Sequence, residues 1–214
     1  MRSKAMPDPW PWYCRVPRVK QRTPELRATL LQVAMSVLAS EGVEGFTTRR
    51  IAEQASTSTP AVYELFGDRA GLVREMFFEG FRRLRMRFDN LSESDDAEAD
   101  LLDAIYAFRS FARDNPELVQ LMFTRPFSDF DPAPKDLQAG TSTREFVIRR
   151  VRRCLDAAIM SGDATDIAHV LLAMCQGLAI QETAGWLGTS DKSRNRRWAL
   201  ATKALVEGMG PRDP

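Results

Sequence analysis

Apolar residues recur at spacings of three and four along most of the chain, and this helical period is the feature that most restricts its fold. Leu26, Leu30, Val33 and Val37 are the clearest example, because on a helix they form one stripe. No segment shows the clear apolar–polar alternation of a half-buried strand. About nine helices are expected, at residues 24–40, 48–55, 59–66, 69–88, 92–113, 116–123, 142–161, 163–187 and 192–208. The sequence therefore predicts an all-α protein.

Helix starts support these ranges. Thr23-Pro24-Glu25 combines a hydroxyl cap, a proline in the first turn and an acid near the positive end of the helix dipole. Thr47 or Thr48 is the expected cap of the second helix, and Ser58 that of the third. The first three helices are therefore short elements with defined beginnings.

The composition is that of a soluble globular chain, with 214 residues of which 44% are hydrophobic and 28% charged. The best candidate for a membrane span, residues 167–180, is shorter than the roughly 18 residues required and contains His169 and Gln176. The N-terminus lacks the apolar core of a signal peptide. We expect a cytoplasmic protein with no membrane partner. Three cysteines without a CxxC pair are expected to be free thiols, a redox switch being the lesser alternative: Cys14, Cys154 and Cys175.

Positive charge is concentrated at the N-terminus. Residues 1–22 contain six basic residues and one acidic residue, a net charge of +5, whereas residues 23–90 are neutral and residues 91–214 carry −4. This proline-rich arm suits an anionic partner, and its bases could follow a DNA minor groove or phosphates. The alternative is a flexible, solvated tail that contributes only weak nonspecific attraction.

The short helix expected at 59–66 has two distinct faces. The apolar side chains share one face: Val62, Leu65 and Phe66. The other face carries small and hydrogen-bonding residues, with Ala61 at its border: Thr59, Pro60, Tyr63 and Glu64. A helix of about eight residues is unstable alone, so helices 24–40 and 48–55 must hold it. An outward face of this kind fits a DNA major groove. The alternative is an ordinary packing helix with a surface tyrosine.

The helix before it presents a suitable phosphate site. The Thr48-Arg49-Arg50 segment brings free amides, a hydroxyl and two guanidinium groups to one helix N-terminus. Arg69, at the start of the fourth helix, is placed for the same purpose. Two helices joined by a short turn in this way predict a helix-turn-helix.

The segment FTTRRIAEQASTSTPAVYELFGDRAGL (46–72) resembles the DNA-binding domain of the TetR family of bacterial transcriptional regulators. The residues that carry the resemblance are a glycine after the first helix (Gly42 or Gly45), the Ile51-Ala52 pair, Tyr63 with Phe66, and Arg69 where the family usually has lysine. The match covers about residues 24–75. Three positions depart from the family pattern: Ser56 replaces the turn glycine, and Glu64 and Leu65 follow the tyrosine.

The resemblance implies three segments: an arm at 1–22, a three-helix DNA-binding domain at 23–76 with its helix-turn-helix at about 47–66, and an effector-binding and dimerisation domain at 77–214. The DNA contacts that it implies are Thr48, Arg49, Thr59, Pro60, Ala61, Tyr63, Glu64 and Arg69. Glu64 could accept from a cytosine amino group or point along the groove edge. The implied partners are a double-stranded palindromic operator, a second copy of the chain and a small hydrophobic effector.

Candidate pocket and interface residues follow less directly. Aromatic residues and methionines around the proline-rich loop 124–136 suggest an apolar cavity, although such residues are more often plain core: Phe108, Phe111, Leu118, Met122, Phe123, Phe127, Phe146 and Met160. The last two helices would pair with those of a second subunit in a four-helix bundle, or form this subunit's own core, or both. Their candidate interface residues are Val170, Leu171, Met174, Leu178, Trp198 and Leu205.

Catalysis is not expected. The one histidine, His169, lies in an apolar helical stripe, where a packed or interface histidine is the ordinary interpretation. No GxSxG, HExxH or phosphate-binding glycine loop is present, and no metal site or cofactor is expected. The sequence thus predicts a ligand-responsive repressor that releases its operator when effector binds. The alternatives are a DNA-coating protein without effector control and, less favoured, an all-helical enzyme.

Overall fold

The computed structural model describes residues 23–124, 127–128, 130–134 and 138–211. Within these residues the regular structure is entirely helical, with nine α-helices and one short 3-10 helix, which confirms the all-α prediction. The elements are α1 (Pro24–Gly45), α2 (Thr48–Gln54), α3 (Thr59–Phe66), α4 (Arg69–Asp89), α5 (Ala97–Asp114), α6 (Pro116–Thr124), η1 (Gln138–Gly140), α8 (Thr141–Asp156), α9 (Ala164–Thr183) and α10 (Asp191–Gly208). The N-terminal arm and Cys14 lie outside the described residues.

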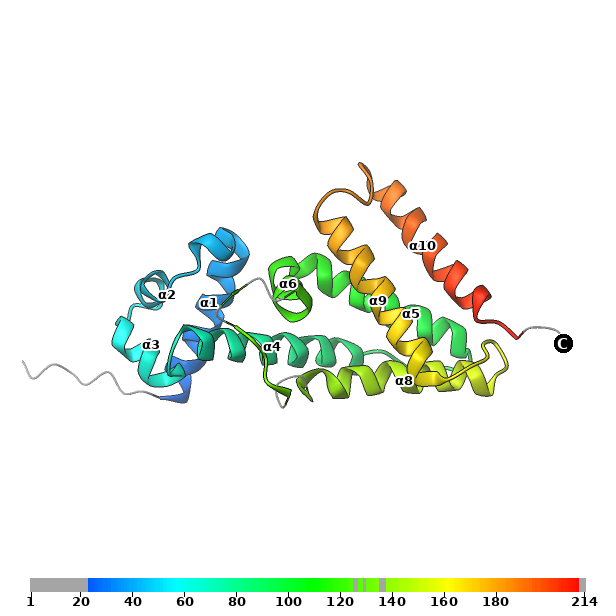
Figure 1. Ribbon diagram of the computed structural model, residues 1–214, viewed down its shortest axis with the longest axis horizontal. Coiled ribbons are helices and arrows are strands. Elements are labelled where there is room, and N and C mark those ends of the chain that lie inside the picture. The colour runs from blue at the N-terminus through cyan, green and yellow to red at the C-terminus, as the bar shows by residue number, and fades with distance from the viewer. Residues whose placement is uncertain (1–22, 125–126, 129, 135–137, 212–214) are drawn as a thin grey trace, which may run out of the picture.

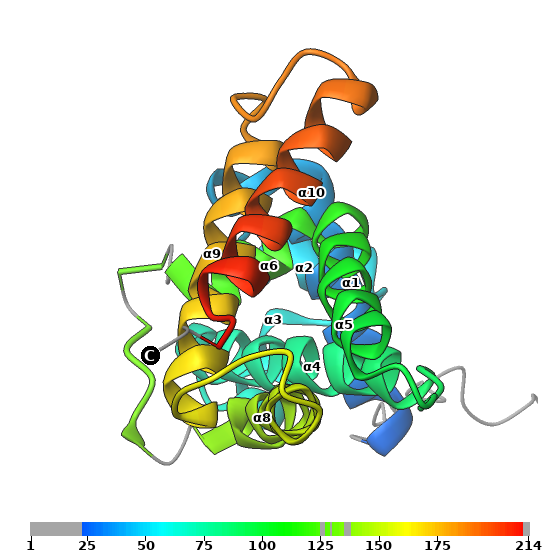
Figure 2. The same cartoon turned by 90° about the vertical axis from the view of Figure 1, so that its right-hand side faces the viewer.

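The helices are arranged along one long axis (Figure 1). α1, α2 and α3 lie together at one end, and α4 leads from them into the larger helical group formed by α5, α6, α8, α9 and α10. α10 lies against α9 on the outside of that group (Figure 2). One apolar core runs through both parts, because α1 packs on α4 and α6. The expected division between residues 76 and 77 falls inside α4, where Met76 and Phe77 are both buried.

Caps fix the starts of three of the first four helices. Leu26 N donates to Thr23 Oγ1 at 3.3 Å, Arg50 N donates to Thr47 Oγ1 at 3.2 Å, and Gly71 N donates to Asp68 Oδ1 at 2.6 Å. Thr47, rather than Thr48, is therefore the cap of α2. Ser58 occupies the cap position of α3 as expected but makes no side-chain cap bond. The cap bonds of α1, α2 and α4 satisfy backbone amides that have no partner within the helix.

Three helices are clearly shorter than predicted: α5 begins at Ala97 instead of 92, and α8 and α9 end early. α8 ends at Asp156 instead of 161, because Ala158 adopts a left-handed φ of 54° and Ile159 N bonds back to Cys154 O at 2.9 Å, which closes the helix end. α9 ends at Thr183 instead of 187, and Gly185 then turns the chain with a φ of 78°. The apolar periodicity extended the predicted ranges of α8 and α9 too far, because the turns that follow these two helices also contain apolar residues.

The structure also bears on membrane-spanning helices, metal-ligating clusters and the cysteines. Among the described residues no helix has the length and apolar character needed to cross a membrane, and no cluster of metal-ligating side chains occurs. Cys154 and Cys175 are free and buried. Burial raises the pKa of the Cys154 thiol to about 11 and that of Cys175 to about 12, so both remain protonated and unreactive near neutral pH.

Replacing Ala158 with glycine should stabilise the fold. A left-handed φ is unfavourable for alanine and open to glycine, so Ala158→Gly should raise the free energy of unfolding by about 0.5–1 kcal/mol in urea titrations. The matched control is Ala157→Gly, since Ala157 is also exposed but has a φ of −84° and should be weakened by the same exchange. Equal effects of the two substitutions would contradict this explanation.

Candidate functional site

The outward surface of α2 and α3 is held in place from behind. Val62 is fully buried and Phe66 is 9% exposed on the inner side of α3, while Ile51 and Ala52 anchor α2. Leu65 is only partly buried but packs against the same core. An eight-residue helix with this much burial is stabilised by its neighbours and not by its own hydrogen bonds.

The opposite face of α3 is open. Pro60, Tyr63 and Glu64 are exposed and Thr59 is half-buried, so the arrangement expected from the helical period is present. Ala61 is a correction: it was expected to contact DNA, but it is only 8% exposed because it lies on the inner side of the border between the two faces. A one-residue step is 100° on a helix, so a border position is decided by packing alone.

Arg27 of α1 braces the far end of α3. Its Nη1 donates to Leu65 O at 2.7 Å, its guanidinium lies 4.7 Å from the centroid of the Phe66 ring, and its Nη2 pairs with Glu75 at 2.9 Å. The contact satisfies a carbonyl group at the C-terminal end of α3. Sequence reasoning missed Arg27, because the first of these partners is 38 residues away in the chain and the others are farther.

The N-terminus of α2 meets α3 at a polar contact. Thr48 Oγ1 and Tyr63 OH lie 3.2 Å apart on the exposed surface. Arg49 projects beside them with a side chain 85% exposed and pairs with Glu53 at 2.9 Å. A pair this exposed contributes little, so the Arg49 guanidinium can exchange that partner for an anion. Arg50 pairs with Glu41 instead, at 2.9 Å.

The turn between α2 and α3 uses serine where glycine was noted as usual. Ser56 has a φ of 52°, which is the left-handed conformation. Glycine adopts a positive φ without steric cost, whereas serine does not. The turn is therefore strained relative to a glycine turn.

Arg69 lies partly inside the protein. Its guanidinium is 4.7 Å from the centroid of the Phe127 ring and 5.6 Å from that of Phe46. These are cation–π distances, and the residue is half-buried. Phe127, which was expected in a pocket, packs instead on Phe46 with 5.2 Å between ring centroids. The segment after α6 thus contacts the α1–α3 end of the molecule directly.

A cavity of about 440 Å³ lies between α4, α5, α6, α8 and α9. Its lining is mostly apolar: Phe77, Phe81, Leu84, Phe108, Met122, Phe123, Gly140, Leu172 and Ala173. Phe108, Met122 and Phe123 were expected there. The structure places the other five candidates elsewhere. Phe111 is buried core, Leu118 lines a smaller cavity of about 170 Å³ near α1, Phe146 stacks on Phe88 at 4.9 Å, and Phe127 and Met160 lie outside the lining.

Four polar side chains line the same cavity: Thr143, Arg144, His169 and Gln176. Sequence reasoning did not assign them to a pocket. The apolar period of α8 and α9 identified the inner faces but gave no sign of which polar residues border an empty space. His169 is exposed and its Nδ1 lies 2.8 Å from Thr165 O, so it is not packed inside this subunit, and the alternative of an interface histidine stays a prediction.

The candidate interface residues of α9 and α10 differ in whether they are buried within this subunit or exposed on its outer face. Leu171 and Trp198 are 2% and 0% exposed within this subunit, so they are core residues and not contacts for a partner. Val170 on α9 is 47% exposed, and Leu200 on α10 is 66% exposed. Met174, Leu178 and Leu205 are half-buried.

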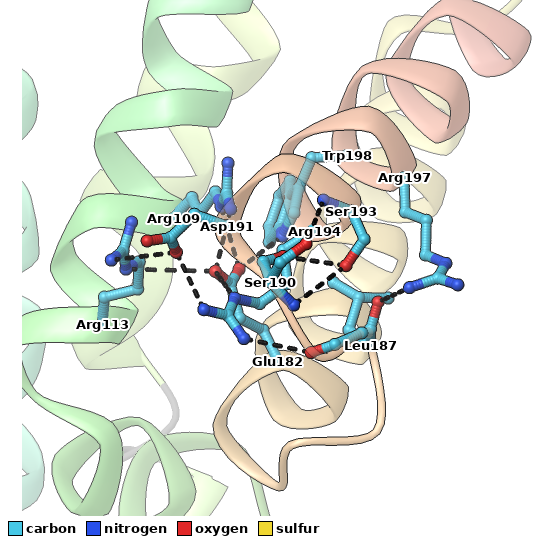
Figure 3. A network of polar contacts seen from close by, with 11 residues as sticks. Arg109, Arg113, Glu182, Leu187, Ser190, Asp191, Ser193, Arg194, Arg197 and Trp198 are labelled. Carbon is cyan, nitrogen blue, oxygen red and sulfur yellow. Dashed lines mark hydrogen bonds and ion pairs between the residues drawn. The ribbon is translucent and has the colours of Figure 1, made fainter.

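A buried ionic network fixes α9 and α10 against α5 (Figure 3). Arg109 donates from Nε and Nη2 to the two oxygens of Glu182, both at 2.8 Å, and Trp198 Nε1 donates to the same carboxylate at 2.6 Å. The side chains of Arg109 and Glu182 are 8% and 7% exposed. Burial alone would raise the pKa of Glu182, but the bonds from Arg109 and Trp198 outweigh it and hold that pKa below its usual value.

Removing the Glu182 charge should destabilise the protein strongly. Glu182→Gln leaves Arg109 buried without a counter-ion, so we expect a loss of about 3–5 kcal/mol in denaturant unfolding at pH 7. Because the folded-state pKa is depressed, the contribution of Glu182 is complete above the pKa of the unfolded state. It declines as the pH falls from about 4 through the lowered pKa of the folded state, and parent and variant should converge below that pKa.

The control for this prediction is Asp191→Asn. Asp191 belongs to the same network but its side chain is 65% exposed, and it pairs with Arg194 at 2.9 Å. Its loss should cost about 1 kcal/mol or less. Equal losses in the free energy of unfolding at the two positions would show that burial does not determine how much each group of the network stabilises the fold.

Two family profiles match the sequence. Residues 30–76 match the profile described as "Bacterial regulatory proteins, tetR family", and residues 101–205 match the one described as "Tetracyclin repressor-like, C-terminal domain". Comparison of the sequence with curated proteins gives no match.

Solved structures share the whole arrangement. A protein of unknown function from Rhodococcus sp. RHA1 is 29% identical, with a TM-score of 0.73 over 87% of this chain and 96% of that one. The TetR family transcriptional regulator PfmR from Thermus thermophilus is 15% identical, with a TM-score of 0.65 over 85% and 99% of the two chains. A TetR variant from Acinetobacter baumannii AYE, in complex with minocycline, is 17% identical, with a TM-score of 0.60 over 85% and 94%.

Proposed function

The chain belongs to the TetR family of DNA-binding transcriptional regulators, and from this premise we propose that it is a repressor whose operator is released when a small hydrophobic effector enters the cavity. Regulators of this family act by binding DNA and not by catalysis, and they often respond to ligands. The minocycline held by the Acinetobacter baumannii relative supports a ligand role for the cavity.

The observation that carries the DNA-binding part is the open face of α3 beside the N-terminus of α2. In our proposal α3 enters the major groove with Thr59, Pro60 and Tyr63 toward the base edges, and Glu64 reads a cytosine amino group or follows the groove edge. The exposure of Pro60, Tyr63 and Glu64, together with the Thr48–Tyr63 contact, supports this placement.

We propose that the N-terminus of α2 binds a DNA phosphate. Thr48 and Arg49 lie where helix amides, dipole and charge favour an anion. Arg69 would bind a phosphate only after its guanidinium turns away from the Phe127 ring. We therefore assign it a phosphate contact that forms when Phe127, in the segment after α6, no longer holds the guanidinium.

Two substitutions test the DNA site. Arg49→Ala should weaken binding to operator and unrelated DNA alike and reduce the slope of log affinity against log salt by about one. Tyr63→Ala should weaken operator binding by about 1–3 kcal/mol. Both are measured by fluorescence anisotropy on an operator selected from random DNA with the parent protein.

Arg152→Ala is the matched control, because Arg152 is an exposed arginine on α8, distant from α2 and α3. It should retain the parent's affinity and salt slope. If Arg49→Ala behaved in the same way, the phosphate assignment would be wrong.

A homodimer would match a palindromic site. We propose that the outer faces of α9 and α10 form the contact, because they lie at the opposite end of the molecule from α3 and expose Val170 and Leu200. A two-fold axis there would let both α3 helices enter successive major grooves, about 34–36 Å apart.

Leu200→Glu should convert the dimer to monomers. It places a charge where the proposed interface buries an apolar side chain, and sedimentation velocity measures the result. Met86→Glu is the control, since Met86 is 58% exposed on α4 and outside the proposed contact. A parent that sediments as a monomer, or a Leu200→Glu variant that remains dimeric, would refute this interface.

A further inference from the structure

We infer that the cavity is built for a hydrophobic carboxylate whose anionic end is held by Arg144. This inference rests on the proposed effector role of the cavity and adds the chemical class of the ligand. It depends on three features of the site as the described residues form it: an aromatic wall, an arginine with no acidic residue beside it in the lining, and a buried hydroxyl that lacks a hydrogen bond.

The apolar wall sets the body of the ligand. Phe81 contacts Phe77 and Phe123 edge-on, with 5.0 Å and 5.8 Å between ring centroids, and Phe108 lies 6.1 Å from Phe123. Such rings bind apolar groups by contact with their faces and edges. A volume of about 440 Å³ falls within the usual range for small-molecule sites, about 300–1,000 Å³. The body of the ligand is therefore apolar and of moderate size.

Arg144 supplies the positive charge. Two other arginines of α8 have acidic partners: Arg150 and Arg153 both pair with Asp100, and Arg153 also pairs with Glu93. Within the described residues the polar contact of Arg144 is with Thr141 Oγ1, at 3.5 Å, and none of the cavity residues is acidic. The bound molecule thus meets a guanidinium group that no carboxylate of the described chain occupies.

Thr143 is the second group at this end of the cavity. It is 4% exposed, and its Oγ1 is buried without a hydrogen-bond partner in the described part of the chain. A buried hydroxyl without a partner is unfavourable, so a ligand oxygen that accepts from it would relieve that state. Gln176 lines the cavity on α9 and can add an amide donor.

These donors select a carboxylate over other charged groups. Its two oxygens can accept from Arg144 and from Thr143 while the apolar body meets the phenylalanines. A phosphate would bring a second negative charge into a largely apolar space with one guanidinium group to balance it. A cation would be repelled by Arg144.

Calorimetry with matched ligand pairs tests the inference. The probes are biphenyl-4-carboxylate and decanoate, each compared with its primary amide, which has nearly the same shape and no charge. For the parent protein we expect at least one acid to bind about tenfold or more tightly than its amide, because a hydrogen-bonded charge pair is lost in the amide.

Three variants identify the groups responsible. In Arg144→Gln the preference for the acid should fall below about threefold, as expected when the charge-assisted bond is gone. Thr143→Val keeps the side-chain shape and should reduce the preference partly. Arg152→Gln makes the same charge change on the exposed side of α8 and should keep the parent's preference.

The inference is overturned if the parent binds neither acid, if it binds each amide as tightly as the acid, or if Arg144→Gln retains the preference. Operator binding is measured separately with the same ligands. Release of DNA by an amide would refute the ligand class but leave the repressor proposal standing. An acid that binds through Arg144 and leaves operator affinity unchanged would refute effector control instead.

Discussion

The continuity of α4 is the constraint on which the rest of the structure depends. Its 21 residues form one helix about 30 Å long, with a hydrogen-bond ladder that does not bend easily. α4 begins at Arg69, beside α3. Phe77 and Phe81 of α4 line the cavity, and Phe88, near its C-terminal end, is buried in the core. A change in the cavity that shifts α4 therefore also shifts the start of α4, because the helix transmits displacement along its axis.

The segment after α6 offers a second physical connection. Phe127 contacts both Phe46 and Arg69, while Phe130 packs on Phe77, with 5.7 Å between ring centroids. Phe77 in turn contacts Phe81 in the cavity wall. Phe127 and Phe130 are connected through the backbone, where Phe130 N donates to Phe127 O at 3.2 Å. Closely packed contacts have few intermediate arrangements, which is how small displacements at a ligand site become discrete changes elsewhere.

Charge is used in two distinct ways. At the α5–α9–α10 junction the Glu182 carboxylate is buried and surrounded by donors, and its removal is costly because it leaves the buried Arg109 guanidinium without this counter-ion. On α2, Arg49 makes an exposed pair with Glu53 that water screens. The first arrangement fixes the position of two helices, and the second leaves a cation able to change partners. The burial of each group, more than its distance to a counter-ion, decides which role it has.

The sequence by itself determined the all-α class, nine helices within the described residues, the Thr23 cap of α1 and the two faces of α3, because helical period and capping are local properties. It could not place Ala61, Trp198 or Phe127, since a residue on an apolar face can meet its own core, a cavity or a partner with the same local pattern. It also missed Arg27, Thr143 and Arg144, whose roles come from neighbours far away in the chain. Only tertiary packing decided which faces were buried, and therefore which polar groups border an empty space and which charges lost contact with water.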